Sequence, residues 1–554
     1  MLPQLCLLFA LWIGLGCVHS LPIPVLGQEC PHYATWARQR DGKELSDGRY
    51  QLPFQRPSEQ CRTFHSQEVE DAIERLRPKI ADPDLFRLFE NAYPNTLDTA
   101  VKWKGFAWED GREGALTDED LAFVITGDIN AMWLRDSANQ ILSYLPVLQA
   151  SEDPDSLAAL FRGVINVQSR YIKITPYCHA FQPPPESGID LESNGAYTKN
   201  TVHIFGKQGY DQKKTFDCKW ELDSLASFLQ ISSDYYNVTG DIRPFEKYQW
   251  VETVEVILAA AEAMRTGTYT PDGHIAPSGY TMKGQTDRAT ETTSNNGIGN
   301  PVIYTGMVRS TFRPSDGDLT EATSSRKAPQ LTSSTDASIF QFLIPSNMMF
   351  ARYLEEAALV MQKLDTQRSR DLESQMRNMA SEIRAGITKY GLVSHPLFGA
   401  IFAFEVDGYG SQNIMDDANL PSLLSASMMG YVSPRDEVYM NTRLFALSEA
   451  NPYWAFGNVF NAVGGPHTGP AKAWPLASIV RVLTSGDVSG EEQRDELRSI
   501  LSTTAGLGLI HESVESHNDK EYTRSWFGWA NGMFGQMILD IEARTPHLLD
   551  DSYQ

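Results

Sequence analysis

The chain has 554 residues, of which 42% are hydrophobic, and its 25 Phe, 22 Tyr and 11 Trp are enough to build a large core. Its formal net charge is −23 and its pI is about 4.9. A nucleic-acid binder needs a basic surface to neutralise phosphates, so this charge balance excludes nucleic acid as an expected partner.

The first 20 residues contain an apolar run from Leu5 to Val18 that ends in Val-His-Ser. The run is too short to span a bilayer, and its small-residue end permits cleavage, so residues 1–20 are predicted to be a secretory signal peptide. No later stretch is apolar enough for a membrane anchor. We therefore expect a secreted, extracellular protein, with retention in a cell wall left open.

Four cysteines follow the predicted signal peptide: Cys30, Cys61, Cys178 and Cys218. An even number in an oxidising compartment predicts two disulfides, and nearness in sequence favours Cys30–Cys61 and Cys178–Cys218 over the other pairings. Asn237 begins an Asn-Val-Thr sequon, which predicts N-glycosylation in a secreted chain.

Residues 21–66 are rich in Pro, Gln and charge and are interpreted as an N-terminal extension. From residue 67 to 554, one catalytic domain is expected. Apolar residues at three- and four-residue spacing predict helices over 68–80, 136–149, 156–172, 219–238, 251–265, 347–364, 371–391, 421–430, 473–486, 493–507 and 526–544. Strand-like alternation is confined to pieces such as 397–408. The pattern predicts an all-α toroid of helical hairpins, with long loops at one mouth.

The first candidate functional residues cluster at predicted helix starts. Trp133, Arg135 and Asp136 lie in "DINAMWLRDSANQ", where sugar recognition and salt-bridged capping explain the residues equally well. Asp223 follows Glu221 at the start of the helix predicted over 219–238, where acids commonly serve as helix-dipole partners. A catalytic role for Asp223 requires a second carboxylate from far along the chain.

A second group of candidates lies in later loops. Asp416, Asp417 and Asn419 precede a predicted helix, and capping explains one of the three, whereas a binding site explains all of them. Calcium is disfavoured because the EF-hand spacing is missing. His467 lies on a glycine-rich loop, and a lone histidine is usually structural.

The strip "HESVESH" contains Glu512 between two histidines. A zinc site of the His-Glu-x-x-His type needs both imidazoles on one helical face, and His511 and His517 are spaced too widely for that. Paired carboxylates and aromatic residues gathered at the mouth of a helical ring instead suit glycoside hydrolysis.

Seven segments resemble, in order, the motifs of glycoside hydrolase family 125: 128–140, 221–229, 310–316, 342–349, 415–424, 464–485 and 508–534. The resemblance runs from Lys79 to Arg544. It implies an (α/α)6 barrel and an exo-acting, inverting α-mannosidase that removes terminal α-1,6-linked mannose from N-glycans or mannan. It also implies that the reaction uses no metal or other cofactor.

Carried onto this chain, the resemblance implies that Asp223 is the general acid and Glu512 the general base. It places Trp133, Arg135, Asp136, Asp416, Asp417, Asn419 and His467 around the terminal mannose. In an inverting enzyme the two catalytic carboxyl groups lie about 6.5–9.5 Å apart, which leaves room for a water molecule. Two alternatives remain open: another inverting (α/α)6 glycosidase of the glucoamylase or trehalase type, and an inactive mannan-binding wall protein.

The chain departs from the family pattern in one place, a Ser/Thr-rich segment at 317–335. Removing it would join Asp316 to Asp336 and restore the pattern. Our hypothesis is that the segment is a retained in-frame intron or a recent insertion.

Overall fold

The computed structural model describes residues 30–194, 200–284, 293–314 and 336–554. The predicted signal peptide at 1–20 and the Ser/Thr-rich segment at 317–335 lie outside these residues. Within the described part, no helix combines the length and the apolar character needed to cross a membrane.

Six elements pack side by side as an inner ring. They are α5 (Leu134–Leu142), α8 (Leu222–Thr239), α11 (Ile344–Lys363), the 3-10 turn η6 (Leu424–Ala426), α14 (Pro475–Leu483) and α16 (Gly528–Arg544). α5 packs on α8, α8 on α11, and η6 contacts both α11 and α14. α16 closes the ring because it contacts α14 on one side and α5 on the other.

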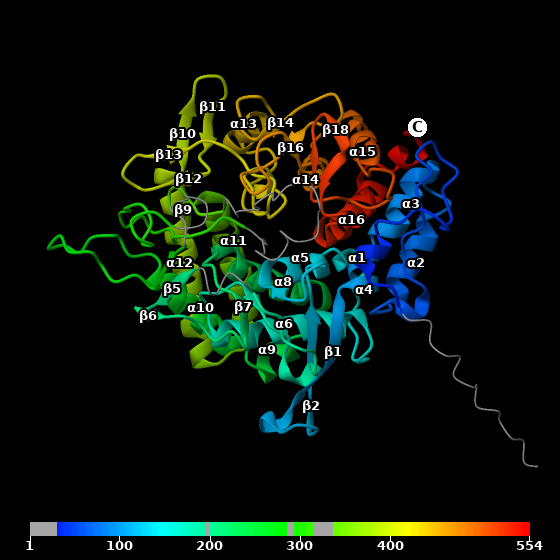
Figure 1. Ribbon diagram of the computed structural model, residues 1–554. Coiled ribbons are helices and arrows are strands. Elements are labelled where there is room, and N and C mark those ends of the chain that lie inside the picture. Colours follow the sequence, from blue (N-terminus) through cyan, green and yellow to red (C-terminus); the bar gives the residue numbers. More distant parts are fainter. Residues whose placement is uncertain (1–29, 195–199, 285–292, 315–335) are drawn as a thin grey trace, which may run out of the picture.

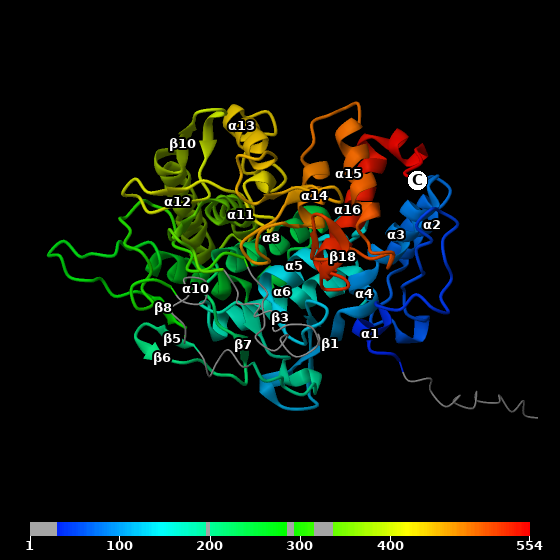
Figure 2. The same cartoon turned by 45° about the horizontal axis from the view of Figure 1, so that its top comes forward.

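Six further helices lie outside this ring (Figure 1). They are α3 (Pro83–Ala92), α6 (Leu157–Ile174), α10 (Trp250–Ala263), α12 (Gln367–Tyr390), α13 (Glu437–Ala446) and α15 (Glu491–Ser502). α12 packs along α11, α13 contacts η6, and α15 packs on α14. α3 contacts α16, so the beginning and the end of the described chain lie side by side, as Figures 1 and 2 show.

Ten of the eleven predicted helices are present, and the prediction for 421–430 is wrong in part. That segment is reduced to η6. Ser422 and Ser425 begin the turn by accepting hydrogen bonds from each other's backbone N–H groups, at 3.1 and 2.9 Å. Gly430, with a φ of 73°, then ends it before a longer helix can form.

The chain is largely helical, as predicted, but its loops carry short strands in small sheets of two or three strands. These strands are β1 (Val101–Trp108), β2 (Leu116–Val124), β3 (Met132–Trp133), β4 (Ala180–Phe181), β5 (Thr201–Ile204), β6 (Lys207–Gln208), β7 (Thr215–Asp217), β8 (Tyr280–Lys283), β9 (Phe342–Leu343), β10 (Leu392–His395), β11 (Gly399–Phe402), β12 (Glu405–Val406), β13 (Gln412–Asn413), β14 (Trp454–Ala455), β15 (Ala462–Val463), β16 (Lys472–Ala473), β17 (Ser513–Glu515) and β18 (Asn518–Thr523). The predicted all-α fold class therefore describes the helical ring but leaves out the strands in the loops.

The remaining short helices are α1 (Tyr33–Trp36), α2 (Gln67–Leu76), α4 (Asn95–Thr99) and α9 (Arg243–Lys247), with 3-10 turns η1 (Glu59–Cys61), η2 (Glu109–Gly111), η3 (Leu145–Val147), η4 (Pro185–Ser187) and η7 (Pro546–Asp550). α2 begins where the sequence predicted the end of the extension, because Ser66 accepts a hydrogen bond from the Val69 N–H and caps the helix.

Both predicted disulfides, Cys30–Cys61 and Cys178–Cys218, are formed. The extension also packs against a distant part of the chain. The Gln55 side-chain amide donates to the Leu507 carbonyl at 2.7 Å, and the Gln55 backbone N–H donates to Asn91 of α3, whose own amide donates to the Gly508 carbonyl at 2.9 Å. These bonds hold the strip that leads into Glu512, so the extension supports the candidate site.

Small residues on α16 allow the ring to close. Gly532 and Gly535 lie three residues apart, on neighbouring positions of the helix surface. A Cβ atom at Gly532 would lie 2.8 Å from the Ser143 hydroxyl, and one at Gly535 would lie 2.1 Å from the Tyr93 ring. Real Cβ atoms do not approach so closely, and the two glycines therefore let the end of the chain reach α5 and the segment after α3.

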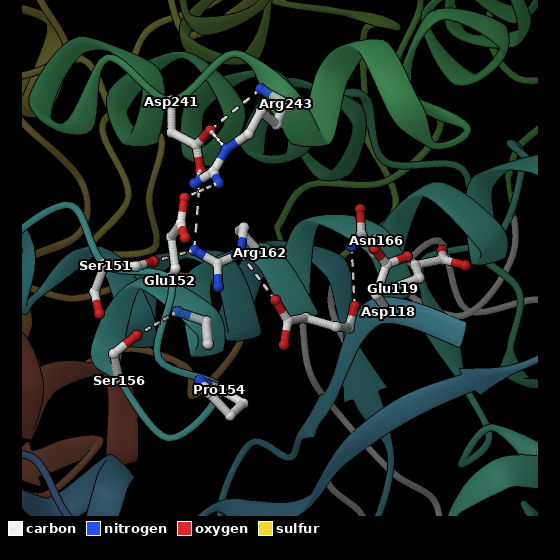
Figure 3. Close-up of polar contacts among 12 residues, drawn as sticks. Asp118, Glu119, Ser151, Glu152, Pro154, Ser156, Arg162, Asn166, Asp241 and Arg243 are labelled. Carbon is white, nitrogen blue, oxygen red and sulfur yellow. Dashed lines mark hydrogen bonds and ion pairs between the residues drawn. The ribbon is translucent and has the colours of Figure 1, made fainter. Parts of the chain in front are cut away.

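A charged network on the outside of the ring joins β2, α6 and the end of α8 (Figure 3). Arg162 donates to Asp120 at 2.8 Å, to the Ser151 carbonyl at 2.8 Å and to the Tyr235 hydroxyl at 3.3 Å. Nearby, Arg243 bonds to Asp241 at 2.7 Å. The groove of about 330 Å³ beside them is lined by these ion pairs. We interpret the network as structural, because its charges satisfy one another.

Replacing Arg162 with Leu is expected to lower the free energy of unfolding by about 1–3 kcal/mol, because the largely buried Asp120 loses its cation. Urea titration monitored by tryptophan fluorescence measures the change. Arg498, whose side chain is 50% exposed in a pair with Asp495, provides the control. Arg498→Leu is expected to change stability by less than about 0.5 kcal/mol. Equal effects of the two substitutions would contradict a structural role for Arg162.

Candidate active site

The first turns of three inner helices meet at one end of the ring. Arg135 lies in the first turn of α5, Asp223 in the first turn of α8, and Ser346 in the first turn of α11. Arg135 Nη1 donates to Asp223 Oδ2 at 2.9 Å, and the Ser346 hydroxyl lies 3.5 Å from Asp223 Oδ1. Helix N-termini carry partial positive charge, so this end of the ring attracts carboxylates.

Arg135 holds a cluster of three carboxyl groups. Besides Asp223, its guanidinium donates to Glu221 Oε2 at 2.7 Å and lies 3.3 Å from Asp136 Oδ2. All four side chains are buried, and the side chains of Glu221 and Asp223 have no exposed surface. The three acids therefore share the Arg135 guanidinium where water does not screen them.

Burial raises the pKa of Asp223 above its usual value, although Arg135 opposes the shift. Burial also raises the pKa of Glu221 well above its usual value, and the nearby Asp223 adds to that shift. Because three carboxylates share one guanidinium, the cluster retains a proton more readily than an exposed acid does. A carboxyl group that keeps its proton is what a general acid requires.

Glu512 forms a second part of the site, immediately before β17. Its side chain is buried, and Glu512 Oε1 lies 3.8 Å from His467 Nε2 and 3.7 Å from Arg524 Nε. Arg524 also lies 3.6 Å from Asp128 Oδ2. The positive charge of Arg524 beside Glu512 suits a group that acts as a carboxylate.

Lys219 and Asp336 connect the two parts. His467 Nδ1 lies 3.1 Å from Asp336 Oδ1, and Lys219 Nζ lies 3.8 Å from Asp336 Oδ2. Lys219 is two residues before Glu221, and its charge acts on that carboxyl group. A series of ionisable side chains therefore leads from Glu512 through His467, Asp336 and Lys219 to the cluster around Asp223.

The chain on either side of 315–335 comes together at this series. The Arg313 N–H donates to the Asp336 carbonyl at 2.6 Å, and Phe312 forms an antiparallel bridge with Ala337. Asp336 therefore reaches His467 because its own backbone pairs with the segment that ends at Pro314. The hypothesis of a retained intron concerns residues outside the described part of the chain and stays a prediction.

The other predicted site residues divide into two groups. Asp417 lies with the site: burial raises its pKa to about 6, while the charges of Arg313 and His467 oppose the rise. Asn419 is buried nearby and donates to the Pro314 carbonyl at 3.2 Å. Asp416 instead accepts hydrogen bonds from the Leu423 and Leu424 N–H groups, at 2.8 and 2.9 Å, and holds the turn at η6.

Trp133 is buried in a small apolar cluster rather than open to solvent. Its ring meets those of Phe216 and His179 edge-on, with centroids 5.5 and 6.0 Å apart. Its indole N–H has no hydrogen-bond partner among the described residues. His179 in turn lies 3.9 Å from Glu221 Oε1, so Trp133 packs behind the cluster around Asp223.

The two histidines of the "HESVESH" strip lie in different surroundings. The strip forms the β17–β18 hairpin and not a helix, so it does not present two imidazoles on one helical face. His511 stacks on Tyr522 with centroids 3.8 Å apart, and burial lowers its pKa to about 4. His517 is exposed and lies 2.9 Å from Asn458. This arrangement agrees with the rejection of a zinc protease site.

Sequence reasoning missed Lys219, Asp336 and Arg524 as site residues. Lys219 and Arg524 lie inside the stretches "FDCKWELD" and "YTRSWF", and their positive charge next to acids was the available signal. Asp336 had a different signal, because removing the Ser/Thr-rich segment joins it to Asp316 and restores the family pattern.

Comparison with known proteins identifies relatives over nearly the whole chain. The model of the family described as metal-independent alpha-mannosidase (GH125) matches residues 82–323 and 329–539. The Meiotically up-regulated gene 157 protein of Schizosaccharomyces pombe is 41% identical over 543 residues, which cover 97% of each chain. A solved metal-independent alpha-mannosidase of Streptococcus pneumoniae, in a non-productive complex with alpha-1,6-mannobiose, is 30% identical with a TM-score of 0.71. That match covers 88% of this chain and 99% of the bacterial one.

Proposed function

The chain belongs to the GH125 family of metal-independent alpha-mannosidases and is a glycoside hydrolase; from this premise we propose that it removes terminal α-1,6-linked mannose by exo-acting, inverting hydrolysis. The alpha-1,6-mannobiose bound by the Streptococcus pneumoniae relative supports this choice of linkage. We take the closed ring of inner and outer helices to be an (α/α)6 barrel.

The observation that carries the proposal is the difference between the surroundings of two carboxyl groups. Burial raises the pKa of Asp223, which shares the Arg135 cation with two other buried acids, whereas Glu512 lies beside the cation Arg524. Two carboxyl groups in such different environments can take different roles, in which one donates a proton and the other accepts one.

In the proposed reaction, Asp223 donates its proton to the glycosidic oxygen as the bond to the anomeric carbon breaks. Glu512 takes a proton from a water molecule, whose oxygen attacks the anomeric carbon from the opposite face. The products are β-mannose and the shortened glycan, and inversion follows because a single displacement occurs. Ser346 and Arg135 orient the Asp223 carboxyl group, and His467 and Arg524 flank Glu512.

Proton NMR of α-1,6-mannobiose hydrolysis tests the mechanism. We expect the β-anomer of mannose to accumulate first and then to equilibrate with the α-anomer. Early appearance of α-mannose would exclude the single displacement. Maltose and trehalose serve as comparison substrates, and turnover of either in preference to mannobiose would favour the glucoamylase- or trehalase-like alternative.

We further propose that the protein is secreted. The signal-like segment at 1–20 and the two disulfides support this location, because disulfides persist in oxidising compartments. N-terminal sequencing of protein from the culture medium is expected to begin near Leu21.

A further inference from the structure

A second cavity, of about 320 Å³, lies at the other end of the inner ring from Asp223. Residues beyond the first turns of the inner helices line it, including Asn139 of α5, Asp234 and Asn237 of α8, and Met533 of α16. Asp234 is 11 residues beyond Asp223 on the same helix, which corresponds to about 16 Å along the axis. The cavity is therefore separate from the candidate active site, and its volume is in the range of small-ligand sites.

The charges in this cavity are close to balanced. Arg352 forms an ion pair with Glu356, and the Gln230 amide hydrogen-bonds to Asp234. Burial and the charge of Glu356 raise the pKa of Asp234 to about 7, so this acid is largely protonated in an acidic medium. The cavity therefore suits a neutral polar ligand better than an ion.

Two buried polar atoms in the lining have no hydrogen-bond partner among the described residues: the acceptor Gln230 Oε1 and the donor Arg352 Nε. Apolar walls stand beside them, formed by Tyr353, Met429 and Met533. A buried donor and acceptor next to aromatic and thioether surface match a sugar ring, which has hydroxyl groups at its edge and C–H groups on its faces.

The chain itself carries an attachment point for such a sugar. Asn237 is exposed, lies in the cavity lining, and begins the Asn-Val-Thr sequon. Its Nδ2, the atom that bears an N-glycan, donates to Glu356 Oε2 at 3.4 Å and is thus directed toward the cavity. We propose that this cavity holds the first N-acetylglucosamine of a glycan on Asn237, which closes the end of the ring opposite the active site.

A double-mutant cycle tests the proposal on protein secreted from a eukaryotic host, with the glycan trimmed enzymatically to one sugar. Asn237→Gln removes the sugar, and we expect it to lower Tm by about 2 °C in the wild-type background. In the Gln230→Ala background the loss is expected to be much smaller, because one sugar contact is already missing. The same four proteins made in the bacterial periplasm, which attaches no glycan, should show no such coupling. Gln67→Ala, at an exposed position on α2, is the matched control and should be additive.

Methionine oxidation provides a readout that does not depend on Gln230→Ala folding. Met428 lines the cavity and is 36% exposed, whereas Met440 is 51% exposed on α13. The sugar should slow peroxide oxidation of Met428 relative to the Asn237→Gln variant and leave Met440 unchanged. The proposal is overturned if mass spectrometry finds Asn237 of the secreted protein unmodified, if the Tm losses are equal in both backgrounds, or if Met428 oxidises equally fast with and without the sugar.

Discussion

Asn in place of Asp223 is expected to reduce kcat/KM for α-1,6-mannobiose by about 10²–10⁴-fold, because the variant has no proton to give to the leaving oxygen. The fold should persist, since the Asn oxygen can still accept the hydrogen bond from Arg135. Circular dichroism and Tm check that it does. Gln in place of Glu512 is expected to cause a loss of similar size, because the attacking water then lacks a base.

Substrates with different leaving groups distinguish the role of Asp223 from that of Glu512. A 4-nitrophenyl α-mannoside releases a stable phenolate and needs little protonation, so Asp223→Asn should lose much less activity on it than on mannobiose. Glu512→Gln should lose the same factor on both substrates, because activation of the water does not depend on the leaving group. The matched control is Glu515→Gln, three residues beyond Glu512 on β17, which should retain activity. Equal defects of Asp223→Asn on both substrates would contradict its assignment as the acid.

The sequence predicted most of the helices that show apolar periodicity and missed α3 (Pro83–Ala92) and α13 (Glu437–Ala446). α3 buries Asp84, Arg87, Glu90 and Asn91 through ion pairs and hydrogen bonds. Polar residues buried by specific partners do not register as an apolar stripe. The β1–β2 hairpin was missed because its strands are only partly buried and do not alternate regularly.

For the candidate site too, the sequence indicated which residues could act but not which residues they contact. Asp223 could be placed at a helix start, but its neighbour Arg135 comes from another helix, and only the closed ring brings them together. Arg135 was expected to grip mannose, whereas in the structure its guanidinium is occupied by Glu221, Asp223 and Asp136. Local spacing identifies groups capable of chemistry, while their partners depend on tertiary packing.

Met in place of Arg135 is expected to lower the free energy of unfolding by about 3–5 kcal/mol, because three buried carboxyl groups lose the guanidinium that they share. The size of the loss should depend on pH. Burial raises the pKa values of Glu221 and Asp223 in the folded state, so the proton they bind favours folding. That contribution is fully present below their unfolded pKa of about 4 and is lost as pH rises through the folded values. Removing Arg135 raises these folded pKa values further, and the variant's deficit should therefore be larger at pH 7 than at pH 4.

Urea titrations of wild type and Arg135→Met across this pH range measure the deficit. Arg370→Met, at a position whose side chain is 51% exposed, is the control and should show a small, pH-independent effect. Arg135→Lys keeps the positive charge but loses the planar guanidinium that bonds to several carboxyl groups at once. Compared with Arg135→Met, it should therefore recover part of the stability but little of the catalytic rate. If Arg135→Met remains folded, the basic limb of its activity profile should move to higher pH, since Asp223 then holds its proton longer, and Arg135→Lys should move it less. A deficit that is constant with pH, or larger at pH 4, would mean that Arg135 contributes through packing and does not control the charge of the acid.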